Sequence, residues 1–290
     1  MKLSHLYNLA VKLGRLYDPR GNRSWKYADT SILFGDPRIN VRRVLVGIDI
    51  EIGELLLADR LRSIRGLDLV ISHHPEGRAL ATLYDVMQVQ ADMLKALGVD
   101  PAVAQKLLEA RSAEVKRKIL PGNHMRSIDA ARLLNIPFMC MHTVADNHAY
   151  YFVREALEKN KPARLRDILR VLEAVPEYRE ARKSRTGPQI ISGSPDSYAG
   201  RIFVEMTGGT EGPKQAYEKL AKKGIRTVVS MHLSETHLSK AREAKINAVI
   251  AGHISSDNLG LNLLLDGIQK QGRFEIINCS GFRRFHHKDF

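Results

Sequence analysis

Short apolar runs alternate with longer amphipathic segments along most of the chain. The short runs are bounded by turn residues, which is typical of buried strands in a parallel sheet. Between them, apolar residues recur every three to four positions, as they do in helices that cover a sheet. The alternation predicts an α/β fold with parallel or mixed sheets flanked by helices.

The expected elements follow from these periods. We expect helices over residues 3–17, 53–63, 83–97, 101–117, 127–134, 162–174, 212–223, 234–245 and 258–270. We expect strands over residues 44–49, 67–72, 136–141, 190–191, 201–206, 227–231, 247–251 and 274–279. Residues 18–40 are polar and contain Gly, Pro, Asp and Asn, which predicts a long loop, and residues 150–159 form a helix or a linker. No internal repeat is visible in the sequence.

Three of the expected strands lead into a histidine that is followed by a small or turn-forming residue. These positions are His73-His74-Pro75, His142-Thr143 and His253-Ile254-Ser255. Ligands of parallel α/β sheets bind beyond the carboxyl ends of the strands. The histidines therefore recur at the place where such a fold builds its site.

Carboxylates accompany two of these histidines. Asp146 follows His142 by four residues, and Asp257 follows His253 by four. If a helix begins at each histidine, this spacing places both members of a pair on one side of the helix. Imidazole and carboxylate together suit zinc, iron, manganese or nickel. Carboxylates can also bridge two cations that activate one water molecule.

The adjacent pair His73-His74 fits a site with two metal ions. On an extended strand the two side chains would point to opposite faces of the sheet. Pro75 forces the chain to turn directly after them, so both can instead reach one site. One histidine for each ion would suit a dinuclear centre, and a pair of surface histidines is the plainer alternative.

Other patterns leave further roles open. Gly122-Asn123-His124 occurs in calcineurin-like metallophosphoesterases, but Asp49-Ile50-Glu51 lacks that family's Asp-x-His. Thr207 to Thr210 could cradle a phosphate on its backbone N–H groups, or could be a plain Gly-Gly turn. His232 and His237 follow another strand and could support the metals or contact a substrate.

Composition places the chain among ordinary globular proteins with a basic surface. The net charge is +13 and 44% of the residues are hydrophobic. Cys140 and Cys279 are the two cysteines, which excludes a four-cysteine zinc site and argues against a disulfide framework. No apolar stretch is long enough for a transmembrane helix, and the N-terminus has no signal-peptide pattern. We therefore expect a cytoplasmic protein that does not enter a membrane.

The order of the motifs resembles that of the Nif-three-like family of dinuclear metal-binding proteins, also known as GTP cyclohydrolase I type-two homologues. That family has His-His-Pro after an apolar strand, then His-Thr-x-x-Asp, and a later strand that ends in Gly-His-x-x-x-Glu. The matching segments here are His73 to Pro75, His142 to Asp146, and Gly252 to Asp257, with Asp257 where the family has Glu. Residues 27–35 also resemble an early segment of the family, whereas residues 161–200 diverge from it.

The resemblance implies a ligand set and an architecture. The implied ligands of two divalent ions, zinc, iron or manganese, are His73, His74, Asp146, His253 and Asp257. His142 would be a further ligand, or would contact the ligands without binding a metal itself. The implied architecture has two interlocked α/β halves, residues 1–158 and 159–290, with the metals at their junction. The implied assembly is a ring-shaped homohexamer.

Two functions fit these features. The first is a metal-dependent hydrolase that acts on an anionic small molecule, such as a nucleotide. The cyclohydrolase resemblance implies GTP, with opening of the purine ring, and His142 and His232 could then support a metal-bound water. The second is a non-catalytic, metal-stabilised oligomeric scaffold that binds nucleic acid or a regulatory protein, for which the positive charge is the motivation.

Overall fold

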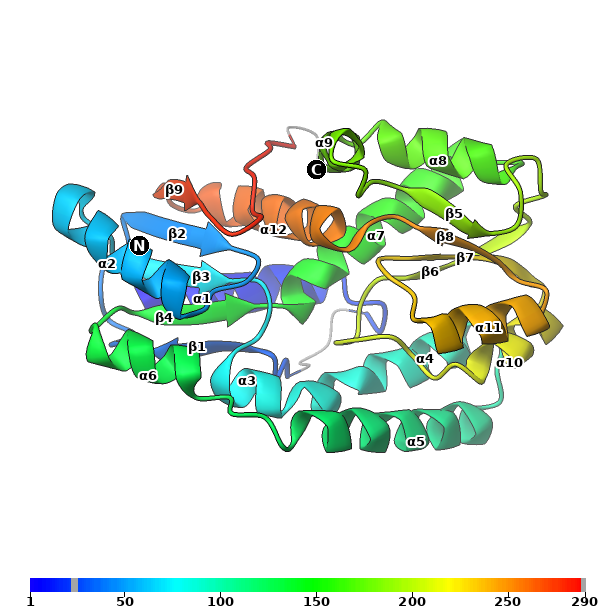
Figure 1. The fold of residues 1–290 in the computed structure, drawn as a ribbon, viewed down its shortest axis with the longest axis horizontal. Coiled ribbons are helices and arrows are strands. Elements are labelled where there is room, and N and C mark those ends of the chain that lie inside the picture. Colours follow the sequence, from blue (N-terminus) through cyan, green and yellow to red (C-terminus); the bar gives the residue numbers. More distant parts are fainter. Residues whose placement is uncertain (22–25, 288–290) are drawn as a thin grey trace.

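Two mixed β-sheets, with helices on their faces, make up the fold (Figure 1). The computed structural model describes residues 1–21 and 26–287. The first sheet has the strand order β1-β4-β3-β2-β9 and the second has the order β5-β8-β7-β6. The strands are β1 (Thr30–Phe34), β2 (Arg43–Gly47), β3 (Leu69–Ser72), β4 (Phe138–Met141), β5 (Gln189–Ser192), β6 (Arg201–Glu205), β7 (Ile225–Ser230), β8 (Asn247–Ile250) and β9 (Glu275–Asn278). The predicted α/β class with mixed sheets is confirmed.

The helices connect successive strands and cover the sheets. They are α1 (Leu3–Leu16), α2 (Ile52–Arg65), α3 (Gly77–Ala81), the 3-10 turn η1 (Leu83–Met87), α4 (Gln88–Ala96), α5 (Pro101–Ile119), α6 (Arg126–Leu133), α7 (Thr143–Asn160), α8 (Leu165–Glu173), α9 (Pro176–Lys183), α10 (Ala216–Lys222), α11 (Glu235–Glu243) and α12 (His253–Gln269). Among the described residues, no helix is long and apolar enough to cross a membrane.

The two sheets repeat one topology. In chain order, β1 to β4 are arranged as β1-β4-β3-β2, and β5 to β8 are arranged as β5-β8-β7-β6. In each set the first strand pairs antiparallel with the fourth, and the other pairs are parallel. Ser72 of β3 and Ser230 of β7 hold equivalent positions, each paired with the last residue of the neighbouring β2 or β6. Only the strand arrangement repeats, which is why the sequence showed no repeat.

The structure departs from the sequence prediction at several elements, among them helices α3 and α9, where no helix was expected. Residues 30–34 form strand β1 inside the segment 18–40 that was expected to be a loop; residues 22–25 of that segment lie outside the described part. Strand β9 pairs with β2 in the first sheet, although the proposed division places it in the half formed by residues 159–290. Helix α12 begins at His253, five residues before the expected start, because Gly252 serves as its N-cap with φ of 110°.

Helices α7 and α12 tie the two sheets together. Ala145 of α7 and Leu261 of α12 pack in the core under the first sheet. Tyr150 of α7 and Leu259 of α12 pack in the core of the second sheet. Both helices begin between the sheets, in the region where the strands end (Figure 1). The N-terminal parts of α7 and α12 are therefore fixed by packing against both sheets.

Candidate metal centre

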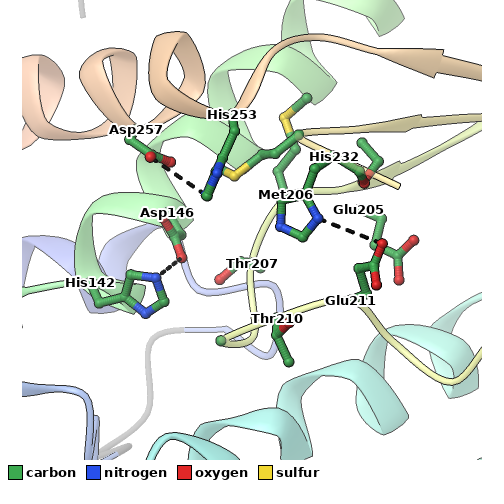
Figure 2. Close-up of a pocket in the computed structure, with 13 residues that line it drawn as sticks. His142, Asp146, Glu205, Met206, Thr207, Thr210, Glu211, His232, His253 and Asp257 are labelled. Atoms are coloured by element: carbon green, nitrogen blue, oxygen red, sulfur yellow. Dashed lines mark hydrogen bonds and ion pairs between the residues drawn. The ribbon is translucent and has the colours of Figure 1, made fainter. Parts of the chain in front are cut away.

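The carboxyl ends of parallel strands from both sheets line one narrow cleft (Figure 2). Its volume is about 40 Å³. The residues that line it are His142, Asp146, Glu205, Met206, Thr207, Gly209, Thr210, Glu211, Ser230, Met231, His232, His253 and Asp257. One wall carries the motif residues His142, Asp146, His253 and Asp257. The other wall carries residues of the segments 205–211 and 230–232, at the ends of β6 and β7 and just after them.

His73 comes directly after β3 and is fully buried. Its Nδ1 lies 3.1 Å from the carbonyl oxygen of Met141. Because a carbonyl can only accept, Nδ1 carries a proton, and Nε2 is the ring nitrogen that faces the two carboxylates. That Nε2 atom lies 3.3 Å from Asp146 Oδ1 and 3.5 Å from Asp257 Oδ1.

His74 is oriented in the same manner by a carboxylate. Its Nδ1 lies 2.6 Å from Asp49 Oδ1, just beyond the end of β2. Its Nε2 lies 3.4 Å from Asp257 Oδ2. The rings of His73 and His74 are 5.3 Å apart, and both present Nε2 to the same carboxylate. The turn at Pro75 therefore does bring the two histidines into one site.

His142 is held from behind by buried Asp29. The His142 Nδ1 atom lies 2.8 Å from Asp29 Oδ2, which also accepts a 2.6 Å hydrogen bond from Thr143 Oγ1. The His142 Nε2 atom then faces the site, 3.8 Å from Asp146 Oδ2. Fixing one ring nitrogen so that the other faces a metal is the usual arrangement behind ligating histidines.

The two aspartates lie near the N-terminal ends of helices, Asp146 in the first turn of α7 and Asp257 one turn further into α12. The helix begins at Thr143 in α7 and at His253 in α12, so the four-residue spacing places Asp146 beside His142 and Asp257 beside His253. His253 Nε2 lies 3.6 Å from Asp257 Oδ2. A helix N-terminus also favours a negative charge in its first turn. A helix therefore does begin at or next to each histidine, ahead of the starts expected from the apolar period.

Several buried ligand atoms in the site have no hydrogen-bond partner, as expected for a cation-binding site. His73 Nε2, Asp146 Oδ1 and both carboxylate oxygens of Asp257 are buried without a hydrogen-bond partner. Buried polar atoms in folded proteins are nearly always paired, so this concentration requires a missing partner. Within the described residues, three groups bring ligand atoms within 4.8 Å of one another: His73, His74 and His142; His74, His253 and Asp257; and His73, Asp146 and Asp257. The donor set therefore fits divalent metal ions.

The electrostatics of the site agree with this interpretation. Burial disfavours a charged His73, but Asp257 and Asp146 outweigh it and raise the pKa of His73 to about 10. Burial is outweighed in the same way at His74, where Asp257 and Asp49 raise the pKa to about 9. Burial alone would raise the pKa of Asp257, but His73 and its neighbours hold it far below its usual value. The carboxylates thus stabilise positive charge at the histidines. Metal ions can supply this charge when they displace the histidine protons.

The second wall of the cleft is built around the loop after β6. Thr207 Oγ1 donates a 2.7 Å hydrogen bond to Asn147 Oδ1, next to Asp146 on α7. Gln90 Nε2 donates to the carbonyl oxygens of Gly208 and Thr210. Gly208 and Gly209 both have positive φ; Gly208 lies against α4 and Gly209 against η1. The segment from Thr207 to Thr210 is therefore a tightly packed turn.

Two glutamates hold the end of this loop. Glu205 accepts hydrogen bonds from the Gly212 N–H at 3.0 Å and from the Tyr217 hydroxyl at 3.2 Å. Glu211 accepts from the Ser234 N–H. Its Oε1 also lies 3.6 Å from His232 Nδ1. Sequence reasoning missed both glutamates, because single acidic residues in a Gly-rich loop carry no motif.

His232 faces the metal-ligand wall across the cleft (Figure 2). Its ring lies 4.7 Å from that of His253. Its position in the second sheet is equivalent to that of His74 in the first. His74 follows Ser72 by two residues, and His232 follows the equivalent Ser230 by two residues. His237, its companion in the sequence analysis, is buried and bonded to the Gly212 carbonyl oxygen at 2.8 Å. His232 therefore belongs to the cleft and His237 to its support.

Other candidates lie outside the cleft. His124 lines a separate surface cavity with Lys118 and Arg126, which separates the Gly122-Asn123-His124 motif from the metal-ligand cluster. Cys140 is buried, with its Sγ 3.4 Å from the Asp29 carbonyl oxygen. Among the described residues that line the cleft, none is lysine or arginine. This lining therefore offers no basic side chain for an anionic substrate.

Comparisons with known proteins place this geometry in context. No family model matches the chain, and no curated protein matches it. The crystal structure of a NIF3 superfamily protein from Sphaerobacter thermophilus matches with a TM-score of 0.81 and 26% identity, over 97% of this chain and 98% of that one. Reduced HcgD from Methanocaldococcus jannaschii matches with a TM-score of 0.58 and 13% identity, over 96% and 97% of the two chains. A Bacillus cereus protein related to NIF3 matches with a TM-score of 0.50 and 13% identity, over 100% and 98%.

Proposed function

We propose that this chain, which belongs to the NIF3-like family, binds two divalent metal ions and acts as a metal-dependent hydrolase. The metals would be zinc, iron or manganese, which histidine and carboxylate ligands suit. One observation carries the proposal. Buried ligand atoms of His73, Asp146 and Asp257 converge without hydrogen-bond partners.

The ligands divide into two overlapping groups. One ion would be held by His74, His253 and Asp257, and the other by His73, Asp146 and Asp257. Asp257 belongs to both groups and has two unpartnered oxygens, which suits a bridging carboxylate. His142, oriented by Asp29, supplies a further ligand or contacts the substrate.

The remaining parts of the cleft would bind and orient the substrate. When bound, two metal ions lower the pKa of a shared water and polarise the group under attack. His232 is held on its Nδ1 side by Glu211, which leaves its Nε2 for a substrate contact. Thr210 and Ser230 line the same wall. The packed loop 207–212 would keep bulk water out of this narrow space.

The proposed substrate is a small anionic molecule, with GTP as the first candidate from the family resemblance. Since the described lining has no lysine or arginine, the positive charge that attracts an anion would come from the metals. Assembly into a homo-oligomer, a hexamer by the same resemblance, is part of the proposal. Sedimentation of the metal-loaded protein tests the assembly.

A hydrolysis screen tests the activity. Metal-loaded wild type would be assayed with GTP, other nucleotides, phosphate and carboxylate esters, and cyclic amides. We expect turnover of at least one class, loss of that turnover in Asp257→Asn, and full activity in the off-site control His124→Asn. If metal-loaded wild type hydrolyses nothing in the panel but binds DNA in a salt-dependent manner, the scaffold function replaces the hydrolase.

A further inference from the structure

A second and larger cavity lies along the β6 edge of the second sheet. Its volume is about 690 Å³, within the usual range for small-molecule sites. Strand β6 forms an edge of its sheet, and helices α4 and α7 flank the space beside it. The residues that line it are Pro19, Met93, Ala96, Leu97, Tyr150, Arg154, Leu157, Glu158, Lys161, Pro162, Ala163, Tyr198, Gly200, Arg201, Ile202, Phe203 and Val204. None of these residues belongs to the metal cleft.

The inner wall of this cavity is apolar and partly aromatic. Met93, Leu157 and Phe203 are each less than one-tenth exposed and belong to the core of the second sheet. Tyr150 adds a second buried ring, and the ring of Tyr198 lies at the rim with 72% of its surface exposed. Such a wall provides dispersion contacts for a flat apolar molecule.

The mouth of the cavity is positively charged. Arg154, Lys161 and Arg201 line it together with a single carboxylate, Glu158. No ion pair among the described residues involves Lys161 or Arg201, and Arg201 donates only to the Lys223 carbonyl oxygen. Arg154, by contrast, is paired with Glu155 at 2.9 Å and lies 3.6 Å from Glu158. Lys161 and Arg201 are thus the cations that retain donor capacity toward the cavity.

The second cavity is separate from the metal cleft. A small void between them is lined by Met93 and Phe203 on one side and by Glu205 and Thr207 on the other. Its volume is about 10 Å³, at or below the space that one water molecule needs. A molecule in the second cavity therefore does not reach the metals, and the cavity is not an entrance to them.

We propose that this second cavity binds a small amphipathic anion, a molecule with an aromatic body and one acidic group at its end. The aromatic body packs against Tyr150, Phe203 and Val204. The acidic group lies at the mouth, where Lys161 and Arg201 carry charges that no carboxylate of the lining pairs, while Glu155 and Glu158 are paired with Arg154. The charge of the mouth selects an anion over a neutral molecule of the same shape, and a volume of about 690 Å³ suits a small molecule.

A pair of fluorescent probes tests the proposal on the full chain. The anionic probe is 8-anilinonaphthalene-1-sulfonate, and the neutral probe is N-phenyl-1-naphthylamine, which lacks only the sulfonate. We expect saturable binding of the anion to the native protein and clearly weaker binding of the neutral probe. The double variant Lys161→Glu with Arg201→Glu should weaken anion binding roughly tenfold, as expected for the loss of two partly solvated charge interactions. The neutral probe should be unaffected.

A cavity-filling variant and matched controls complete the test. Ala96→Trp places an indole at the lining and should abolish binding of both probes, while Ala102→Trp on α5 should change neither. Lys106→Glu with Arg117→Glu, a charge reversal on α5 away from the cavity, should leave the anion affinity intact. Equal affinity for the two probes, or insensitivity to the Lys161 and Arg201 reversals, would overturn the proposal. So would anion binding that disappears as the protein concentration rises, because a second copy of the chain would then cover this face.

Discussion

Gly260 of α12 lies directly against the backbone of Ala145 of α7. A Cβ atom at Gly260 would overlap the Ala145 carbonyl oxygen and lie 2.9 Å from its carbonyl carbon. Asp257 lies one turn before Gly260, and Asp146 follows Ala145. The close crossing of the two helices therefore sets the separation of the two carboxylates that face His73.

Replacing Gly260 with alanine should therefore harm both folding and metal binding. Overpacking against rigid backbone costs up to about 3 kcal/mol, and the gain in helix propensity returns about 1 kcal/mol. We expect the free energy of unfolding to fall by roughly 2 kcal/mol and the metal affinity to weaken. Gly53→Ala on α2 is the control, since nothing lies within 4 Å of its added Cβ. Equal metal affinity in Gly260→Ala and wild type would show that the helix crossing does not set the site.

The orientation of His74 by Asp49 gives a second prediction. Asp49→Asn removes the charge behind the His74 ring while keeping the shape, and the Asp49 side chain is 58% exposed, so the fold should survive. Loss of such a partner typically weakens metal binding about 10–100-fold. Isothermal titration with zinc would measure the change. Asp36→Asn, an exposed aspartate paired with Arg38, should bind zinc like wild type.

The sequence predicted the side of the cleft that carries recurring motifs. His73-His74-Pro75, His142 to Asp146 and His253 to Asp257 are visible because histidine follows an apolar strand in each. The α/β class followed from the same strand pattern, and the NIF3-like resemblance agrees with the structural matches.

The rest depended on contacts between distant segments. Asp29 and Asp49 hydrogen-bond to His142 and His74, which are far from them in the chain. Neither aspartate lies in a sequence motif that would indicate this contact. Strand β1 is short and flanked by Gly, Pro and Asp, so its pairing with β4 decides its structure. Strand β9 joins the first sheet because β2 offers it an open edge, which no period in the sequence reveals.

Glu211 should make the stability of the metal-free protein sensitive to acid. Burial raises the pKa of its carboxyl from 4.5, but His232, His237 and the Ser234 N–H more than offset this and lower it to about 2. A depressed pKa means that the carboxylate stabilises the fold above about pH 4.5, and that this contribution is lost as the pH falls toward about 2. The contribution is at most about 3 kcal/mol.

Urea unfolding of wild type and Glu211→Gln, both treated with a chelator, measures this effect. Near neutral pH the variant should be less stable, and the difference should shrink as the pH approaches about 3. Glu109→Gln, an exposed change on α5, should follow wild type at every pH. A wild-type advantage that is constant across this range would contradict the assigned role of Glu211.

Removal of metal should lower the melting temperature. Metal that binds only the folded chain stabilises it by about 2.7 kcal/mol when its free concentration is a hundred times Kd. For a chain of this size that corresponds to roughly 5–10 °C. Differential scanning calorimetry with and without chelator measures the shift. Asp257→Asn should show little or none of it, and a chelator effect of full size in that variant would place the metal elsewhere.

Elemental analysis of the purified, metal-reconstituted protein tests the central claim most directly. Wild type would be measured beside His74→Ala, Asp146→Ala and the off-site control His124→Asn. We predict about two equivalents of zinc, iron or manganese in wild type and control, as a dinuclear centre requires, and a clear loss in both ligand variants. A wild-type protein that holds no metal after reconstitution, or ligand variants that retain the full content, would contradict the account.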